Sequence, residues 1–346
     1  MKHKIGVIVD GLGINEWVEA NVLGGKWYAQ AHDIELDIAA PKSIDPDEQM
    51  KVIREVVDRK PEAIIVMPIR GEAVEPALSF AREQGIAVIT EDMLVRTDSP
   101  VMDVRFDSFD AGVRAGTGML DKLNTQYGSI PEGNIIVIVS KKNPHQSERA
   151  NGFKSVLEKK KELNIIELDV TPCAEMTDLA YQGVSSLLDE NKILGCFGYG
   201  NLVTIGIVNA IDKKECFKPR DIKDHIIVTG IDACPKTIDL MKTGKIDLLI
   251  DQPCSFYIPL SLHFAIKYLE EGNSGLPKEG EKITEDSLII EGADPGNVNP
   301  WKVQSWSPAQ VEMVYGHRWL KTGTVEVNPA NCEESWLWGN FIRKFM

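Results

Sequence analysis

The sequence predicts an α/β protein made of two lobes, each a doubly wound parallel sheet. Short apolar runs alternate with helical patterns along most of the 346 residues. The runs are continuously apolar and rich in β-branched residues, which is typical of parallel strands covered by helices on both faces. Their number is too large for one open sheet of ordinary size or for a closed eight-stranded barrel, so two lobes fit the pattern better.

The first part of the chain opens with KIGVIV, which predicts a strand. The helix expected from about residue 46 begins at Asp45-Pro46, with Glu48 in its first turn, a common start for a helix. We expect strands at 4–9, 34–39, 63–67, 86–90 and 101–106, and helices at 15–31, 46–59, 72–84 and 108–124.

The second part repeats this alternation as far as residue 271. We expect strands at 134–139, 165–170, 193–198, 225–230 and 246–250, and helices at 146–160, 176–190, 200–212, 235–243 and 254–271. The last of these strands lies in IDLLIDQP, residues 246–253, where a buried apolar run ends in a carboxylate, an amide and a proline. We interpret Gln252 as facing a ligand cleft where the chain passes from one lobe to the other.

The chain from Glu291 onward has a different composition, rich in Pro, Gly, Asn and Trp. Five of the seven tryptophans lie here, at positions 301, 306, 319, 336 and 338. We expect this extension to pack on its own lobe. The alternative is a lid or a docking surface for another protein, because aromatic residues are favoured at interface hot spots.

Bulk composition excludes several classes of partner. Lys and Arg total 38 and Asp and Glu total 52, which gives a net charge of −14. Nucleic acids and anionic membranes are therefore poor candidates, because like charges repel. No apolar run approaches the roughly 18 residues that a membrane span needs.

The six cysteines predict structural thiols rather than a metal centre. None forms a CxxC pair, and no histidine joins them at metal-ligand spacing, so we expect no metal and no cofactor. Cys234 and Cys254 each follow a strand end, and spacing alone leaves a disulfide between them open.

Polar residues gather just after the predicted strands, where open α/β sheets bind ligands. Carboxylates, amides and arginines recognise vicinal hydroxyls by paired hydrogen bonds, and an indole can stack on a C–H face, so the set suits a sugar or polyol. Taken singly, an Asp after a strand is more typical of a helix N-cap, Trp17 of core and Arg149 of an ion pair. The candidate ligand-binding residues are Asp10, Asn15, Glu16, Trp17, Arg70, Glu91, Asp92, Asp107, His145, Arg149, Asn201, Asp232 and Gln252.

From about residue 4 to 290 the sequence resembles the type I periplasmic binding proteins of the ribose- and galactose-binding kind, which share their core with LacI-type repressors. IAVITED is similar to the family's IPVITLD and places a ligand-binding Asp at Asp92. SERANGF is similar to RERGEGF, with Arg149 as the arginine that clamps the sugar. The stretch VTGIDACPKTIDLMKTGKIDLLIDQP resembles the family segment that gives Asp232 and Gln252 as ligand contacts.

The resemblance also implies an organisation and a function. It places residues 1–106 plus 253–285 in an N-terminal lobe, and residues 107–252 plus 286–346, including the extension, in a C-terminal lobe. A monosaccharide or polyol would be captured in an interlobe cleft by hinge closure and delivered to the permease of an ABC transporter, by a monomer without a cofactor. The alternative is a sensory binding protein that signals to a membrane receptor or regulator.

Several positions depart from the family pattern. Asp92 is followed by Met93 where ribose-type members have arginine, and Gly200 stands where they have asparagine, with Asn201 beside it. Trp17 replaces a pair of phenylalanines. We find no counterpart of the galactose-type calcium loop, and the Trp-rich extension is not standard, so the site is not expected to be tuned to ribose.

Enzyme and repressor functions fit the residues less well. Asp10-Gly11-Leu12-Gly13 hints at a dinucleotide fingerprint, but Glu16 occupies the third glycine position and would repel a pyrophosphate. No GxSxG elbow is present, and no helix-turn-helix precedes the first strand. No signal peptide pattern is visible in the sequence. The family resemblance implies a periplasmic or extracellular protein whose leader is absent from this sequence, with a cytoplasmic location as the alternative.

Overall fold

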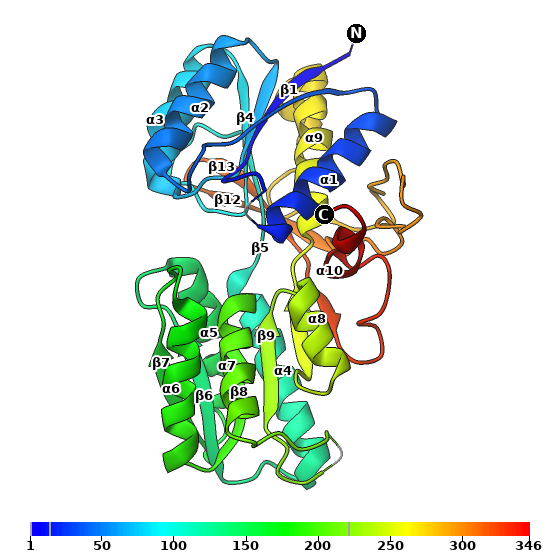
Figure 1. Ribbon diagram of the computed structural model, residues 1–346. Helices are drawn as coiled ribbons and strands as arrows, with labels where there is room; N and C mark the ends of the chain where they lie inside the picture. Colours follow the sequence, from blue (N-terminus) through cyan, green and yellow to red (C-terminus); the bar gives the residue numbers. More distant parts are fainter. Residues whose placement is uncertain (1, 14, 221) are drawn as a thin grey trace. The chain divides into compact units, whose positions relative to one another are not determined.

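The computed structural model describes residues 2–13, 15–220 and 222–346, and the chain divides into two compact units (Figure 1). Unit 1 comprises Met1–Phe106, Pro253–Gly323 and Phe341–Met346, and unit 2 comprises Asp107–Gln252 and Thr324–Asn340. The chain therefore passes from one unit to the other four times. The first two passages coincide with the boundaries expected after residues 106 and 252.

Unit 1 contains an eight-stranded sheet in the order β11-β12-β13-β5-β4-β3-β1-β2. The first five strands of the chain and β13 run parallel, whereas β11 and β12 are antiparallel to their neighbours. The strands are β1 (Lys4–Ile8), β2 (Glu35–Ala39), β3 (Ala63–Val66), β4 (Ala87–Glu91), β5 (Met102–Phe106), β11 (Lys282–Ile283), β12 (Ala309–Val314) and β13 (His317–Thr322).

Helices cover both faces of this sheet, as its continuously apolar strands predict. One pair, α2 and α3, lies on one face, and the pair α1 and α9 lies on the other (Figure 1). Apolar side chains of α2 and α3, such as Ile53 and Leu78, pack with Ile8, Ile64 and Val66 into a closed core. The helices are α1 (Glu16–Ala31), α2 (Pro46–Asp58), α3 (Gly71–Glu83) and α9 (Cys254–Glu271), which continues into the 3-10 helix η1 (Gly272–Gly275).

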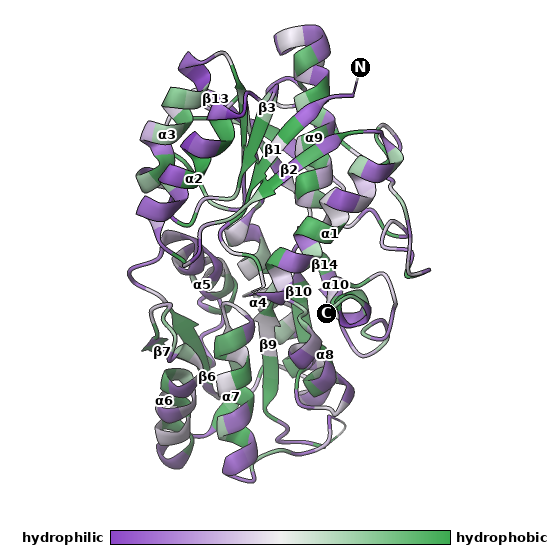
Figure 2. Ribbon diagram, turned by 45° about the horizontal axis from the view of Figure 1, so that its top comes forward, coloured by the Kyte–Doolittle hydropathy of each residue, from purple (hydrophilic) through white to green (hydrophobic). Residues whose placement is uncertain are grey.

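Unit 2 is built in the same way around a six-stranded sheet in the order β14-β10-β9-β8-β6-β7. Helix α4 packs on α5, and α6 packs on α7. Figure 2 shows that β9 is largely hydrophobic. The strands are β6 (Gly133–Val139), β7 (Leu163–Asp169), β8 (Ile193–Gly198), β9 (Ile227–Ile231), β10 (Leu248–Asp251) and the antiparallel β14 (Val325–Val327). The helices are α4 (Ser108–Tyr127), α5 (Pro144–Leu157), α6 (Met176–Glu190), α7 (Asn201–Lys213) and α8 (Pro235–Lys242).

The predicted fold class is confirmed, and the strands and helices expected up to residue 271 are all present within a few residues. No helix among the described residues has both the length and the apolar character to cross a membrane. All six cysteines are free thiols, so Cys234 and Cys254 do not form a disulfide.

The C-terminal extension differs from what we expected. Residues 286–323 and 341–346 belong to unit 1 rather than to the C-terminal lobe, and only Thr324–Asn340 belongs to unit 2. The reason is strand pairing, because β13 adds to β5 in parallel and carries β12 and β11 with it. At the unit 2 edge β14 pairs with β10. The short helix α10 (Trp338–Phe341) and the 3-10 helix η2 (Ile342–Lys344) end the chain.

The tryptophans of the extension are packed rather than displayed. Trp301, Trp306, Trp336 and Trp338 are each at most 8% exposed. The indole Nε1 of Trp338 donates to Asp251 Oδ1 at 2.9 Å. This packing leaves these four indoles unsuited to a docking surface.

Candidate functional site

The two units share one topology, and it marks where each would hold a ligand. Strands β1 to β5 lie in the order 2-1-3-4-5, and β6 to β10 repeat that order. In such sheets ligands bind beyond the carboxyl ends of the strands, near the point where the strand order reverses. That point lies between β1 and β3 in unit 1 and between β6 and β8 in unit 2. The predicted site residues fall into these two groups.

In unit 1 the central group is Glu91, the last residue of β4, which is fully buried. Its Oε1 accepts a hydrogen bond from Asn21 Nδ2 at 3.0 Å, and its Oε2 has no partner among the described residues. Burial raises the pKa of this carboxyl to about 8, helped by the nearby carboxylates of Asp92 and Asp10 and opposed by the Asn21 bond. Glu91 is therefore largely protonated at neutral pH.

Asp10 follows β1 and is the second carboxyl of this group. Burial raises its pKa to about 6, while its own backbone N–H and that of Gly11 oppose the shift. Its Oδ1 is buried and has no hydrogen-bond partner in the described part of the chain. At neutral pH Asp10 is mostly ionised, so it is an acceptor beside the protonated Glu91.

Trp17 completes the group from α1. It lies one helical turn before Asn21, on the same face of the helix as the residue that binds Glu91. Its ring meets Tyr257 edge-on, with centroids 6.1 Å apart, and its Nε1 is buried without a partner among the described residues. Unit 1 thus offers one donor and two carboxyl oxygens that its own side chains do not satisfy, which is rare for buried groups.

The other predicted residues of unit 1 lie at its surface or shape its loops. Asn15, Glu16 and Arg70 are exposed, and Asn15 caps α1 by accepting from the backbone N–H of Trp17 at 2.9 Å. Asp92 has a φ of 63°, a left-handed conformation that directs the chain sharply out of β4.

In unit 2 the site is organised around Arg149 and Asp232. Arg149 on α5 is 7% exposed, donates from Nη1 to the carbonyl oxygen of Tyr199 at 2.9 Å, and lies 3.8 Å from Asp232 Oδ2. Asp232 Oδ1 accepts from Gln252 Nε2 at 2.7 Å. Burial raises the pKa of Asp232, while Arg149 and Gln252 favour its ionised form. Arg149 from one motif and Asp232 with Gln252 from another therefore form one polar group, joined by an ion pair and a hydrogen bond.

Two glycines set the position of Arg149. A Cβ on Gly112 of α4 would lie 2.0 Å from the carbonyl oxygen of Arg149, and a Cβ on Gly152 of α5 would lie 2.0 Å from that of Phe109. Only glycine allows the two helix backbones to approach this closely. The small residues in FDAGVRAG and RANGF therefore hold α5 on α4 and fix where the guanidinium begins.

Gln252 is held by the strand end that carries it. Its neighbour Asp251 is buried and accepts from the backbone N–H of Ala233 and from Trp338 Nε1, both at 2.9 Å. Burial raises the pKa of Asp251 to about 7. In IDLLIDQP, Asp251 therefore ties β10 to the turn after β9 and to the extension, and Gln252 contacts Asp232.

A cavity of about 100 Å³ lies beside this group, lined by Arg149, Tyr199, Gly200, Asn201 and Asp232 among others. A Cβ at Gly200 would lie 3.7 Å from Asp232 Oδ2, so the missing side chain leaves space next to the carboxylate.

The sequence did not single out Gln146, which also lines this cavity and whose Oε1 is buried without a partner in the described chain. Its position three residues before Arg149, on the same face of α5, was the available signal.

Three further predicted residues of unit 2 have local structural contacts. Asp107 caps α4, accepting from the backbone N–H groups of Phe109 and Asp110 at 2.9 and 3.1 Å. Asn201 Oδ1 accepts from the N–H of Leu202 at 2.8 Å, and His145 lies half-buried in the first turn of α5. These contacts explain Asp107 without a ligand, whereas Asn201 still borders the cavity.

The described residues contain no cluster of three or more His, Cys, Asp or Glu side chains able to hold a metal ion. Two doubly wound units, each with buried polar groups at its strand ends, define the architecture of a solute-binding protein.

The chain belongs to the family described as periplasmic binding protein domain, whose sequence profile matches residues 5–273. The predicted resemblance is thereby confirmed, as is the prediction of a binding protein rather than an enzyme.

Two curated relatives share low but extended similarity. A xylitol-binding protein of Mycolicibacterium smegmatis is 23% identical over 48% of this chain and 45% of its own length. A multiple sugar-binding periplasmic protein of Azospirillum brasilense is 22% identical over 70% of this chain and 71% of its own. The matched segment thus spans less than half of the first relative. An arabinose-binding protein of Geobacillus stearothermophilus has the same fold, with a TM-score of 0.72, 19% identity and coverage of 96% of this chain and 98% of that one.

Proposed function

We propose that this protein captures a monosaccharide or polyol with side chains from both units and delivers it to the permease of an ABC transporter from a periplasmic or extracellular location. The main observation in support is the group of buried polar atoms in unit 1 that lack a hydrogen-bond partner among the described residues, namely Asp10 Oδ1, Trp17 Nε1 and Glu91 Oε2. A hydroxyl group both donates and accepts, so adjacent ligand hydroxyls would pair with this mixture of acceptors and donors.

Unit 2 supports the same ligand chemistry. The planar guanidinium of Arg149 and the amide of Gln252 flank the Asp232 carboxylate, a combination that recognises neighbouring hydroxyls by paired hydrogen bonds. The relatives whose names specify xylitol, multiple sugars and arabinose support the proposal. We further propose that ligand bound to one unit recruits the other, because only contacts unique to the closed state favour closure.

A thermal-shift screen tests the ligand class. Pentoses, hexoses, polyols and inositols would be compared, with nucleotide cofactors as controls. One-site binding well above Kd raises the melting temperature by several degrees through mass action. A shift with one sugar or polyol supports the proposal, and a response only to nucleotides contradicts it.

Arg149 and Trp17 test whether both units contribute. We expect Arg149→Ala to weaken binding of the identified ligand by about 30-fold or more, because it leaves Asp232 buried without its cation. Arg149→Lys keeps the charge but loses the fork and should also bind weakly. Trp17→Ala should reduce affinity independently from unit 1. The control is Arg54→Ala, at an exposed position on α2. Unchanged affinity in Arg149→Ala, with the circular dichroism spectrum preserved, would refute the site.

A further inference from the structure

A further cavity lies in unit 1, away from the candidate ligand-binding residues Asp10, Trp17 and Glu91. Its volume is about 280 Å³, just below the roughly 300–1,000 Å³ typical of small-molecule pockets. Its walls include Ala87 at the start of β4, Val101 just before β5 and His317 at the start of β13. These three strands are parallel, so the cavity lies at their amino ends, whereas Glu91 and Asp92 mark the opposite edge of the same sheet.

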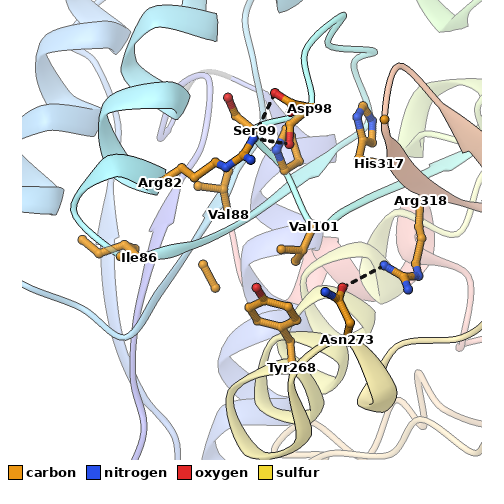
Figure 3. A pocket seen from close by; sticks show the side chains of 14 residues that line it. Arg82, Ile86, Val88, Asp98, Ser99, Val101, Tyr268, Asn273, His317 and Arg318 are labelled. Atoms are coloured by element: carbon orange, nitrogen blue, oxygen red, sulfur yellow. Dashed lines mark hydrogen bonds and ion pairs between the residues drawn. The ribbon is translucent and has the colours of Figure 1, made fainter.

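Two arginines stand on different walls of this cavity (Figure 3). Arg82 comes from the last turn of α3. Its Nη1 lies 2.9 Å from both the carboxylate and the backbone carbonyl oxygen of Asp98. Arg318 on β13 donates from Nε to the carbonyl oxygen of Pro277 at 2.9 Å and from Nη1 to Asn273 Oδ1 at 3.2 Å. A guanidinium has five N–H donors, and the contacts with described residues use two in each case.

The charge of the lining is positive even though the whole chain carries −14. Arg82 and Arg318 contribute two positive charges against the single carboxylate of Asp98. His317 adds no third charge, because burial lowers its pKa. Its Nδ1 lies 2.7 Å from the Thr97 carbonyl oxygen, and its Nε2 is buried without a partner among the described residues.

Apart from Ser99 and Asn273, the rest of the wall is mainly apolar. Ile86, Val88 and Val101 line the cavity together with Tyr268 from α9, and Figure 3 shows Val101 between the two arginines and Tyr268 below them. A hydrated inorganic anion would leave this surface without a complementary contact, and a neutral sugar would leave the excess positive charge uncompensated.

We infer that this cavity binds a compact organic monocarboxylate, with its carboxylate at Arg318 or Arg82 and its apolar body against Tyr268 and the start of β4. Carboxylates match the planar guanidinium fork. The inference does not depend on the proposed sugar function, because the residues involved are separate from Asp10, Trp17 and Glu91.

Titration calorimetry with benzoate on the sugar-free full chain tests it. Benzamide, a neutral isostere, and inorganic phosphate, an anion without an apolar body, are the comparison probes. We expect benzoate to bind at one site. Benzamide and phosphate should bind with an affinity at least about tenfold lower. Equal binding of benzoate and benzamide, or tighter binding of phosphate, would overturn the assignment.

Variants place the binding on the molecule. Arg318→Gln should weaken benzoate binding about tenfold or more. Because Arg318 also anchors the loop at Pro277, the more exposed Arg82→Gln is a second variant, and it too should weaken binding. Arg54→Gln on α2 and Arg149→Gln in unit 2 should leave benzoate affinity unchanged. Full benzoate affinity in both Arg318→Gln and Arg82→Gln, or its loss in Arg149→Gln, would contradict a site in this cavity.

Discussion

At the scale of single residues, the unusual feature is a buried carboxyl that the fold holds in its protonated form. Among the described residues Glu91 has only Asn21 as a side-chain hydrogen-bond partner, it lies near other carboxylates, and its pKa is raised to about 8. An orphaned acid of this kind costs stability and is typical of functional positions. In the proposed complex it would donate its proton to a ligand oxygen while Asp10 accepts.

This arrangement predicts how stability depends on pH. Folded Glu91 keeps its proton up to about pH 8, whereas in the unfolded chain it would lose it near 4.5. Between these values the folded state binds more protons, so its free energy of unfolding falls as pH rises. Glu91→Gln removes this titration. Between pH 5 and 8 we expect the free energy of unfolding of the variant, relative to that of the wild type, to increase by up to about 1.4 kcal/mol per pH unit.

Urea unfolding of the ligand-free protein at several pH values would measure that difference. Glu16→Gln, which changes an exposed glutamate at the start of α1, is the matched control and should follow the wild type. A Glu91→Gln variant whose pH profile parallels the wild type would contradict the assigned protonation state.

At the scale of elements, the contact between α4 and α5 links packing to the site. Gly112→Ala would place a methyl group 2.0 Å from the Arg149 carbonyl oxygen, against backbone that cannot rotate away. We expect a loss of about 1–3 kcal/mol in the free energy of unfolding, because the helices must separate. Ligand affinity should fall as well, because Arg149 moves with α5.

Gly118→Ala on the same helix provides the comparison. Its new Cβ meets only the end of the Leu248 side chain, at 2.1 Å, and that side chain can change rotamer. Alanine also favours the helix, so this variant should be close to neutral. Equal stability of the two variants in urea would show that the backbone contact does not limit the packing.

At the scale of the whole molecule, the C-terminal extension belongs to both units. Deleting residues 324–346 removes β14 from the edge of β10, the Trp338 hydrogen bond to buried Asp251, and the packing of Phe341 on Trp27, whose centroids are 5.5 Å apart. We expect this truncation to lower the melting temperature strongly or to prevent soluble expression, because buried surface and an acceptor are exposed together.

A milder variant separates these effects. Trp338→Phe keeps most of the apolar packing and removes only the donor to Asp251, so we expect a loss of about 1–3 kcal/mol. Differential scanning calorimetry of both proteins measures the outcome. A truncated chain with the same melting temperature as the full-length protein would show that the extension is dispensable for folding.

Sequence patterns predicted the fold up to residue 271 because parallel strands and their helices carry strong local signals. They missed β12 and β13, although Tyr315-Gly316, both with positive φ, form a two-residue turn between alternating runs. Nothing local shows that β13 pairs with β5, because that contact joins distant parts of the chain.

The candidate site was predictable to a similar degree. Arg149, Asp232 and Gln252 emerged from their motifs, and the structure brings them into one group. The buried state of Glu91 and the position of Gln146 depend on packing that no single motif encodes.

The pairing of β5 with β13 also determines how long β5 lacks its neighbouring strand during synthesis. The first five strands are complete at Phe106, but the neighbour of β5 begins only at His317, about 210 residues later. At roughly 5–20 residues per second the ribosome needs about 10–40 s to supply it. During that interval β5 presents an open row of backbone N–H and C=O groups, a template on which other nascent strands can pair. The nascent chain is therefore most exposed to aggregation before the segment that begins at His317 has been made.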